Sequence, residues 1–310
     1  MSLAVYTHPC CVLHNMGMSH PESPERLKRI HDLLKRAPYC DLPQITAEEA
    51  PLSAIAEAHP MPYIHFLQDN LPDDGLIALD SDTLLCPESW EAALTGAGAV
   101  CQAVDDVLAG KYDAAFCATR PPGHHAMPEQ AMGFCFFNNV FIGARQAQKS
   151  GKAPKVAIVD FDVHHGNGTD YMARHAEDIF FASSHQFPLY PGTGDPKDNI
   201  AGKILNIALN HGDGSNAFRA VYEQQVFPAL EEFSPDILMI SAGFDAHKDD
   251  PLGGLNLTAE DFFWVTKELK TQTASRNGGK IVSVLEGGYN IDALEDCVSA
   301  HLDVLTTASA

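Results

Sequence analysis

Short apolar runs recur along the chain and are separated by longer segments of mixed polarity. The runs occupy residues 3–6, 114–118, 156–161, 179–183, 204–208, 237–241 and 281–285. Their residues are apolar at successive positions rather than at every second position, which is typical of parallel strands buried on both faces. The pattern therefore predicts buried strands of a parallel sheet.

Helical patterns fill the segments between these runs, at residues 24–36, 88–108, 139–149, 217–232, 259–273 and 291–306. Ser23 before Pro24 predicts a helix cap followed by proline in the first turn, and Thr258 with Asp261 resembles a capping box. Alternating strands and helices favour an α/β fold with helices on both faces of the sheet. No linker or repeat interrupts the pattern, so we expect one domain over residues 1–310.

Composition limits the location and the partners. The eight cysteines contain no CxxC pair, which predicts buried free thiols in a reducing compartment. No apolar segment reaches the roughly 18 residues of a membrane span, so we expect a cytoplasmic protein without a membrane partner. The net charge of −21 would repel a phosphate backbone and excludes nucleic acid as a favoured partner. Whether this charge attracts cationic substrates or only maintains solubility stays open.

Histidine, aspartate and tyrosine follow the ends of four predicted strands. The segments TRPPGHHA, DFDVHHGNG, AGFDAHKDDPLGG and EGGYN come directly after the runs that begin at residues 114, 156, 237 and 281. Ligands of open parallel sheets bind beyond the carboxyl ends of the strands. We therefore expect these side chains to form one site.

Three of these residues could share a metal ion. Asp162 and His164 are two positions apart in an extended segment and point to the same side, and Asp245 can add a third ligand. Two carboxylates and one imidazole leave a position open, as in catalytic zinc sites. The alternative, that these residues only form turns and hydrogen bonds, stays open on spacing alone.

A histidine pair and a tyrosine could supply the remaining chemistry. His124 and His125 follow a rigid Pro-Pro-Gly segment and could exchange protons with a substrate. Asp160 could orient one imidazole and Asn167 the other, and the two rings should then titrate differently. Tyr289 follows two glycines and could donate a hydrogen bond to an oxyanion, unless it only closes the end of a strand.

The motifs HPESPERL, RPPGHHA, GFCFFNN, DFDVHHGNGT, GFDAHKDDPLGG and LEGGYN cover nearly the whole chain. Together they resemble the histone deacetylase superfamily, which includes bacterial deacetylase-like amidohydrolases and acetylpolyamine amidohydrolases. At positions 167 and 286 the chain has Asn and Glu and so resembles the class II branch, whereas class I members typically have Asp and Gly there. The resemblance implies a three-layer arginase–deacetylase fold with a central, mainly parallel sheet of about eight strands.

The resemblance also implies roles for the candidate residues. Asp162, His164 and Asp245 would bind zinc (Zn2+), with iron (Fe2+) as an alternative metal. His125 would be the general base and then the acid, with His124 as an electrostatic helper held by Asp160. Tyr289 would polarise the acetyl carbonyl together with the metal, so that the reaction yields acetate and a free amine.

Further sites follow from the same resemblance. A potassium ion (K+) would lie near the zinc. Its expected ligands are Asp160, Asp162, His164, Ser183 and Ser184. An acyl-lysine tunnel is implied as well. Its expected residues are Gly133, Phe134, Tyr190 and Leu252 along the tunnel, Asp82 at the rim and Arg26 at the floor.

The substrate remains open between two classes. An acetylated lysine peptide or related acyl amide is favoured over an acetylated polyamine, because Leu252 stands where some polyamine-selective relatives have glutamate. An arginase-like two-metal ureohydrolase is a distant alternative, since His165 rather than an aspartate follows the ligand His164. A binding module without activity is a third alternative. The oligomeric state and the physiological substrate are not predicted.

Overall fold

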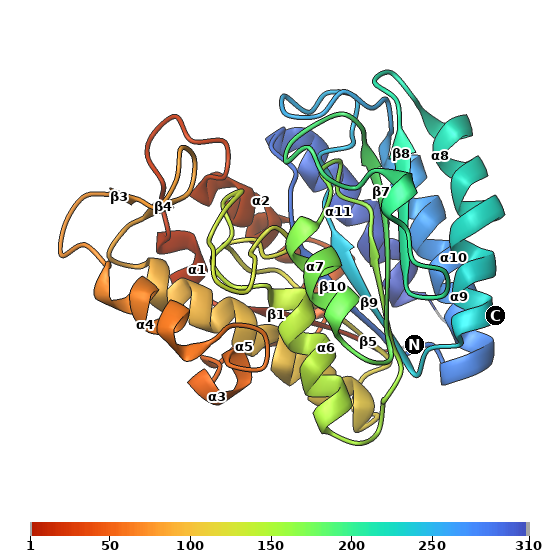
Figure 1. Cartoon of the computed structure of the whole chain (residues 1–310), viewed down its shortest axis with the longest axis horizontal. Helices are drawn as coiled ribbons and strands as arrows, with labels where there is room; N and C mark the ends of the chain where they lie inside the picture. The colour runs from red at the N-terminus through yellow and green to blue at the C-terminus, as the bar shows by residue number, and fades with distance from the viewer. Residues whose placement is uncertain (1, 308–310) are drawn as a thin grey trace.

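A parallel sheet of eight strands forms the centre of the molecule (Figure 1). The computed structural model describes residues 2–307, with the side chains of all of these except 275–277. The strands are β1 (Leu3–Thr7), β2 (Gln44–Thr46), β5 (Ala114–Cys117), β6 (Val156–Asp160), β7 (Ile179–Gln186), β8 (Ile204–Leu209), β9 (Ile237–Ala242) and β10 (Ile281–Leu285). All seven predicted runs are strands. The short edge strand β2 was not predicted, because its residues are not buried.

The order of the strands brings the four candidate segments together. The order is β2-β1-β5-β10-β9-β6-β7-β8, so β10, the last strand of the described chain, pairs with β5 on one side and β9 on the other. Strands β5, β10, β9 and β6 are therefore consecutive neighbours. Because all four run parallel, their carboxyl ends and the segments that follow meet at one edge of the sheet.

Helices cover both faces of the sheet and complete three layers (Figure 1). One face packs against α2 (Pro24–Leu34), α8 (Ser215–Val221), α9 (Phe227–Phe233), α10 (Ala259–Asn277) and α11 (Ile291–Thr306). The opposite face packs against α5 (Ser89–Leu108), α6 (Asn139–Lys149) and α7 (Asn167–His175). The three-layer α/β arrangement agrees with the prediction from the alternating pattern.

Smaller elements lie outside the main layers. They are α1 (Cys10–Leu13), α3 (Leu52–Ile55), α4 (Met61–Asp69), the antiparallel pair β3 (Ile77–Ala78) and β4 (Leu84–Leu85), and the 3-10 turns η1 (Tyr39–Asp41) and η2 (Pro196–Asp198). The predicted helix 217–232 is divided into α8, the π-helical turn η3 (Tyr222–Val226) and α9. In a π-helical turn the backbone hydrogen bonds join residues i and i+5 instead of i and i+4. The side chains that follow are therefore rotated relative to a regular α-helix.

The structure confirms only some of the predictions for helix starts and for the burial of the cysteines. The capping box of Thr258 and Asp261 is present at the start of α10, whereas Ser23 makes no side-chain cap bond at α2. All eight cysteines are free, and Cys40 is exposed, so the expectation of burial was wrong there. Within residues 2–307, no helix has the length and apolar character needed to cross a membrane.

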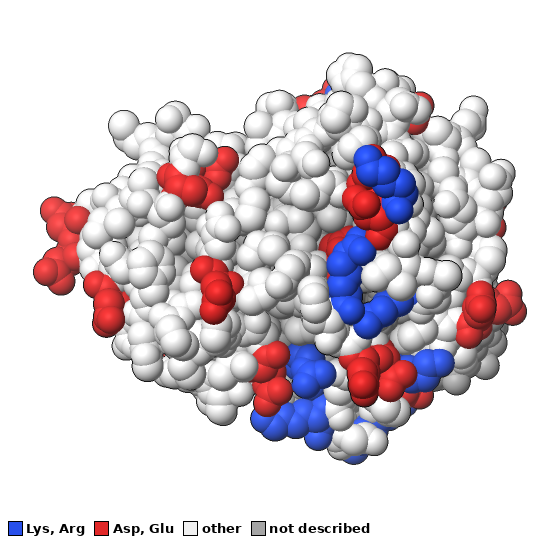
Figure 2. Space-filling model, in the orientation of Figure 1, with Lys and Arg blue, Asp and Glu red and all other residues white. Residues whose placement is uncertain are grey.

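Basic and acidic side chains lie next to one another on one face of the molecule (Figure 2). On the face that Figure 2 shows, the Lys and Arg side chains lie beside Asp and Glu side chains rather than forming a separate basic surface. The ion pairs of the molecule include Lys149 with Glu57 at 2.9 Å and Arg174 with Asp170. Paired charges of this kind neutralise each other locally. Nucleic-acid binding stays a matter of the prediction from net charge.

Candidate active site

Asp162, His164 and Asp245 meet where β6 and β9 end. Each offers one donor atom, and these atoms lie within 4.8 Å of one another. The Nδ1 atom of His164 is 3.1 Å from Asp162 Oδ1 and 3.1 Å from Asp245 Oδ2. The three residues are almost fully buried. Two carboxylate oxygens and one imidazole nitrogen at these distances fit a zinc ion that keeps a further position open.

Backbone amides hold both carboxylates in place. Val163 N donates to Asp245 Oδ1 at 2.8 Å, and Gly287 N donates to Asp162 Oδ2 at 2.9 Å. A side chain at Gly287 or at Gly243 would collide with these carboxylates, so both positions require glycine. The loops after β6, β9 and β10 therefore fix the positions of both carboxylates.

Protonation of the three groups is coupled in the metal-free protein. Burial by itself lowers the pKa of His164, but Asp162 and Asp245 outweigh burial and raise this pKa to about 10. Burial, together with the charge of Asp162, raises the pKa of Asp245 to about 7. A proton on His164 thus occupies the position of positive charge that a metal ion would take.

The histidine pair follows β5 and has two different partners. The Nδ1 atom of His124 is 2.9 Å from Asp160 Oδ2, and Nδ1 of His125 is 2.8 Å from Asn167 Oδ1. The two ring centroids are 4.0 Å apart. Burial lowers the pKa of His124, but Asp160 outweighs burial and raises it well above its usual value. For His125, burial and the neighbouring His124 lower the pKa. The two rings therefore titrate differently.

Tyr289 follows β10 and packs against Arg26, the residue predicted at the floor of the site. Its backbone N–H donates to Asp250 Oδ2 at 2.7 Å, and the Arg26 guanidinium lies 5.0 Å from the centre of its ring. Burial raises the pKa of the phenol well above 10, so the hydroxyl keeps its proton at neutral pH and can donate it in a hydrogen bond.

A cavity of about 230 Å³ connects these groups. Its lining residues are Asp82, His125, Gly133, Phe134, His164, Leu189, Tyr190, Leu252 and Tyr289. The structure therefore brings all the predicted tunnel and rim residues to one cavity with His125, His164 and Tyr289. Gly133 has φ +56° and no room for a side chain beside His125. Arg26 lies behind the Tyr289 ring rather than in the lining.

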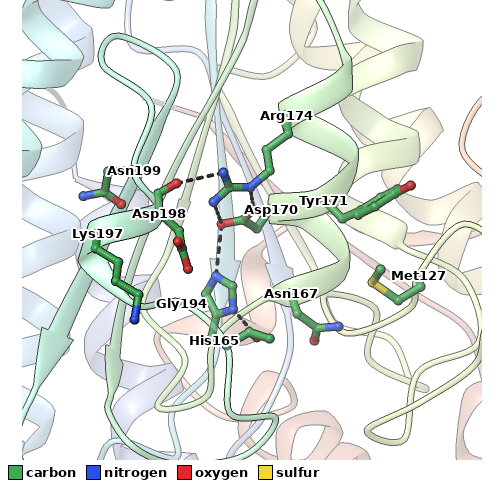
Figure 3. Close-up of a pocket in the computed structure, with 11 residues that line it drawn as sticks. Met127, His165, Asn167, Asp170, Tyr171, Arg174, Gly194, Lys197, Asp198 and Asn199 are labelled. Carbon is green, nitrogen blue, oxygen red and sulfur yellow. Dashed lines mark hydrogen bonds and ion pairs between the residues drawn. The ribbon is translucent and has the colours of Figure 1, made fainter.

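A larger cavity of about 440 Å³ lies between α7 and the segment around η2 (Figure 3). Asn167 and His165 contribute to its wall, and the polar groups around it are bonded to one another. His165 bonds to Thr193 at 2.8 Å, and Arg174 bonds to Asp170 and to the backbone of Asp198. The donor set and the histidine pair identify the smaller cavity as the candidate active site, although it has the smaller volume.

Two of the predicted potassium ligands, Asp160 and Ser183, are neighbours in the sheet. Ser183 pairs in register with Asp160 across β6 and β7, and both side chains are buried. The Ser183 hydroxyl is 2.9 Å from His185 Nδ1, and the Ser184 hydroxyl is 3.0 Å from the Tyr222 hydroxyl. Potassium binding at this place stays a prediction.

Two acidic residues of the site have roles that the sequence motifs alone do not reveal. Asp250 accepts the backbone N–H groups of Tyr289 and Asn290 and so fixes the segment after β10. Glu22 lies fully buried between Arg26 and Arg120, and its Oε1 accepts from Arg26 Nη1 at 3.0 Å. Glu22 lies in the motif HPESPERL and Asp250 in the motif GFDAHKDDPLGG. Their place in these motifs was the only sign in the sequence that they contribute to the site.

Comparison with known proteins gives consistent matches. The chain matches the family described as Histone deacetylase domain over residues 20–305. It is 36% identical over 293 residues to the histone deacetylase-like amidohydrolase of Pseudomonas aeruginosa, which covers 93% of this chain and 77% of that protein. It is 35% identical over 352 residues to Type-2 histone deacetylase 2 of Dictyostelium discoideum. That match covers 98% of this chain but 21% of the longer protein.

A solved structure agrees with the fold. The HDA15 HD domain superposes with a TM-score of 0.90 at 32% sequence identity, covering 97% of this chain and 90% of that one. This similarity, together with the eight parallel strands, confirms the arginase–deacetylase fold expected from the motifs.

Proposed function

The chain belongs to the histone deacetylase family, and we propose that it is a zinc-dependent deacetylase that hydrolyses acetyl-lysine or related acyl amides to acetate and a free amine. The observation that carries this proposal is one cavity that contains His125, His164 and Tyr289. His125 belongs to a histidine pair with unlike partners, and His164 belongs to a set of three candidate metal donors. Zn2+ is the proposed metal and Fe2+ the alternative.

Asp162, His164 and Asp245 would hold the ion. The ion would act as a Lewis acid on the acyl carbonyl and make a water molecule acidic enough to lose a proton near neutral pH. The chain contributes the fixed positions of the donors, because backbone amides orient both carboxylates before any ion binds.

His125 is the proposed general base and acid. Its Nδ1–H donates to Asn167, so Nε2 carries the free lone pair and can take a proton from water. The low pKa of His125 keeps the ring neutral for that step. The same nitrogen then delivers the proton to the departing amine. His124, positively charged beside Asp160, stabilises the negative charge that develops nearby.

Tyr289 is the proposed oxyanion donor. Its neutral phenol lies in the cavity, and the segment that carries it is held by Asp250 and Arg26. A donor fixed before the reaction stabilises the tetrahedral oxyanion without reorganisation. Phe134 and Tyr190 would enclose the aliphatic stem of the substrate, with Asp82 near the opening.

The nature of the substrate beyond an acyl amide is part of the proposal. The Leu252 side chain lines the cavity and offers no partner for a distant ammonium group, which favours acetyl-lysine over an acetylated polyamine. Bound K+ near Asp160 and Ser183 and a cytoplasmic location also belong to the proposal. Eight free cysteines support a reducing compartment.

The test combines metal analysis with hydrolysis of a fluorogenic acetyl-lysine amide and of acetylated polyamines. The proposal expects one catalytic zinc or iron ion per chain and faster turnover of the lysine amide. Two bound manganese ions with urea-forming activity would instead identify a ureohydrolase. Binding of acyl-lysine without turnover would identify a binding module, and either result would overturn the proposal.

A further inference from the structure

A buried carboxylate without a part in the proposed proton transfers lies directly behind the histidine pair. Glu286 follows β10 and is fully buried. Its Oε2 atom accepts the backbone N–H of Gly123 at 2.7 Å and that of His124 at 3.1 Å. Its Oε1 atom accepts the Ser241 hydroxyl at 3.2 Å. Both oxygens are therefore used, and two of the three bonds go to the backbone of the segment that carries the histidines.

The Gly123–His124 segment depends on acceptors from outside itself. It leaves β5 as irregular chain, so these two amides have no strand or helix partner. On the opposite side the carbonyl oxygen of His124 accepts the N–H groups of Gly168 at 3.1 Å and Thr169 at 3.2 Å. The segment is thus held between Glu286 and the start of α7. Removal of the carboxylate would leave two buried N–H groups without an acceptor, which is unfavourable.

The same residue also belongs to the segment that carries Tyr289. Its backbone N–H donates to Ala242 at 2.9 Å, and its carbonyl oxygen accepts from Arg26 Nη2. Arg26 Nε donates to the carbonyl oxygen of Gly288 at 2.6 Å. The backbone at Glu286 is therefore held by bonds that do not involve its side chain. From this fixed backbone the side chain binds the amides of the histidine segment and so holds that segment in place.

We propose that Glu286 is a positioning residue that joins the two catalytic segments and sets the place of the histidine pair relative to Tyr289. This proposal rests on the proposed deacetylase function. Glu286 does not line the substrate cavity, so its removal should lower turnover more than substrate binding. An error of about 1 Å in the position of a catalytic group is sufficient for a rate loss on the order of a hundredfold.

The charge and the hydrogen bonds of Glu286 can be tested separately. The charged or titratable groups near its carboxylate are His124, Asp160 and Cys135, and Arg26 contacts its backbone. In Glu286→Gln the amide oxygen can still accept both backbone N–H groups, while the negative charge is removed. Glu286→Asp keeps the charge, but its side chain is one methylene shorter and cannot reach the amides. Glu286→Ala removes both.

The first measurement does not require a loaded or active enzyme. Hydrogen exchange of the Gly123 and His124 amides is followed by NMR in the metal-free protein. We expect exchange at least about tenfold faster in Glu286→Ala and Glu286→Asp than in wild type, and nearly wild-type exchange in Glu286→Gln. Unchanged exchange in the alanine and aspartate variants would overturn the proposal, whether or not the protein is a deacetylase.

The second measurement compares kcat and KM for an acetyl-lysine amide. We expect kcat to fall about 10- to 100-fold in Glu286→Ala and Glu286→Asp, with KM within about twofold and with the metal content unchanged. Glu286→Gln should restore kcat to within about threefold of wild type.

Ser241→Ala is the matched control, because it removes the third bond of the same carboxylate and leaves the two backbone bonds in place. It should keep kcat within about twofold of wild type. An equal loss in Ser241→Ala, or a loss that appears only in KM, would overturn the assignment of Glu286 as a positioning residue.

Discussion

The amide oxygen of Asn167 lies 2.8 Å from the Nδ1 atom of His125 and can only accept a hydrogen bond. The amide nitrogen of Asn167 donates to the carbonyl oxygen of His125 at 3.4 Å and to Met132 Sδ at 3.4 Å, so the orientation of the amide is defined. His125 therefore carries its proton on Nδ1 and leaves Nε2 free. The partner of His124 is a carboxylate instead, which favours a charged ring.

This difference between partners predicts unequal effects of substitution in the histidine pair. His125→Ala removes the proposed general base and should lower kcat by about 10²- to 10⁴-fold. His124→Ala removes only electrostatic stabilisation and should lower kcat less. Steady-state rates at fixed metal content measure both effects. A larger loss at His124 would reverse the two roles.

Removal of the Tyr289 hydroxyl should slow the chemical step without weakening the binding of metal or substrate. Tyr289→Phe should keep metal content and KM and lower kcat by about a hundredfold or more, as for loss of one oxyanion donor. The aromatic ring keeps its contact with Phe134, at 5.8 Å between centroids, so the cavity should not collapse. Unchanged turnover of the acetyl-lysine amide would remove the role assigned to this hydroxyl.

Metal binding should release a proton. With the metal chelated, the raised pKa of His164, about 10, keeps this imidazole protonated at pH 7, whereas a metal ion requires the neutral ring. We expect zinc titration at pH 7 to release one proton from His164 and about half a proton from Asp245 per ion, because the pKa of Asp245 is about 7. Calorimetry in two buffers of different ionisation enthalpy gives this number. Asp162→Asn should lose the high-affinity binding, and a heat independent of buffer would contradict the expectation.

The residue at position 252 should determine the preference for acetyl-lysine amides over acetylated polyamines. Leu252→Glu places a carboxylate in the lining of the cavity, where it can attract the distant ammonium group of an acetylated polyamine. We expect the ratio of kcat/KM for acetylated polyamine over acetyl-lysine amide to rise about tenfold. Leu252→Gln, similar in size and without charge, is the control. An equal change in both variants would exclude an electrostatic cause.

The buried ion cluster at Glu22 predicts acid sensitivity. Burial raises the pKa of Glu22, but Arg120 and Arg26 outweigh burial and lower this pKa to about 2. Because the folded pKa is below the unfolded value near 4.5, the stabilisation is complete above about pH 4.5 and is lost as pH falls toward 2. Glu22→Gln should reduce the free energy of unfolding at pH 7 by about 3–5 kcal/mol, because it leaves two buried cations without a counter-ion.

Chemical denaturation at several pH values measures this effect. The stability difference between wild type and Glu22→Gln should shrink between pH 4.5 and 2. A difference that does not depend on pH would show that packing rather than charge makes Glu22 important.

The sequence predicted seven of the eight strands of the main sheet and the candidate side chains that the structure brings together at one edge. Runs such as 156–161 are apolar at successive positions because their strands are buried on both faces, and the residues after them meet because parallel strands end at one edge. The place of β10 between β5 and β9 depends on packing between distant segments, which no local pattern records. The roles of Asp250 and Glu286 could not be predicted from the sequence. Both carboxylates accept backbone N–H groups, and since almost every residue has such a group, the sequence does not show which residues are the donors.

The position of β10 has a consequence for synthesis of the protein. During translation the segments for β1, β5, β6 and β9 leave the ribosome first, yet β5 and β9 have no direct contact in the sheet, since β10 separates them. The two halves of the sheet can join only after residues 281–285 have emerged, and Tyr289 follows within four residues of that strand. A nascent chain therefore gains its last central strand and the proposed oxyanion donor nearly together, and the candidate active site stays incomplete until that moment.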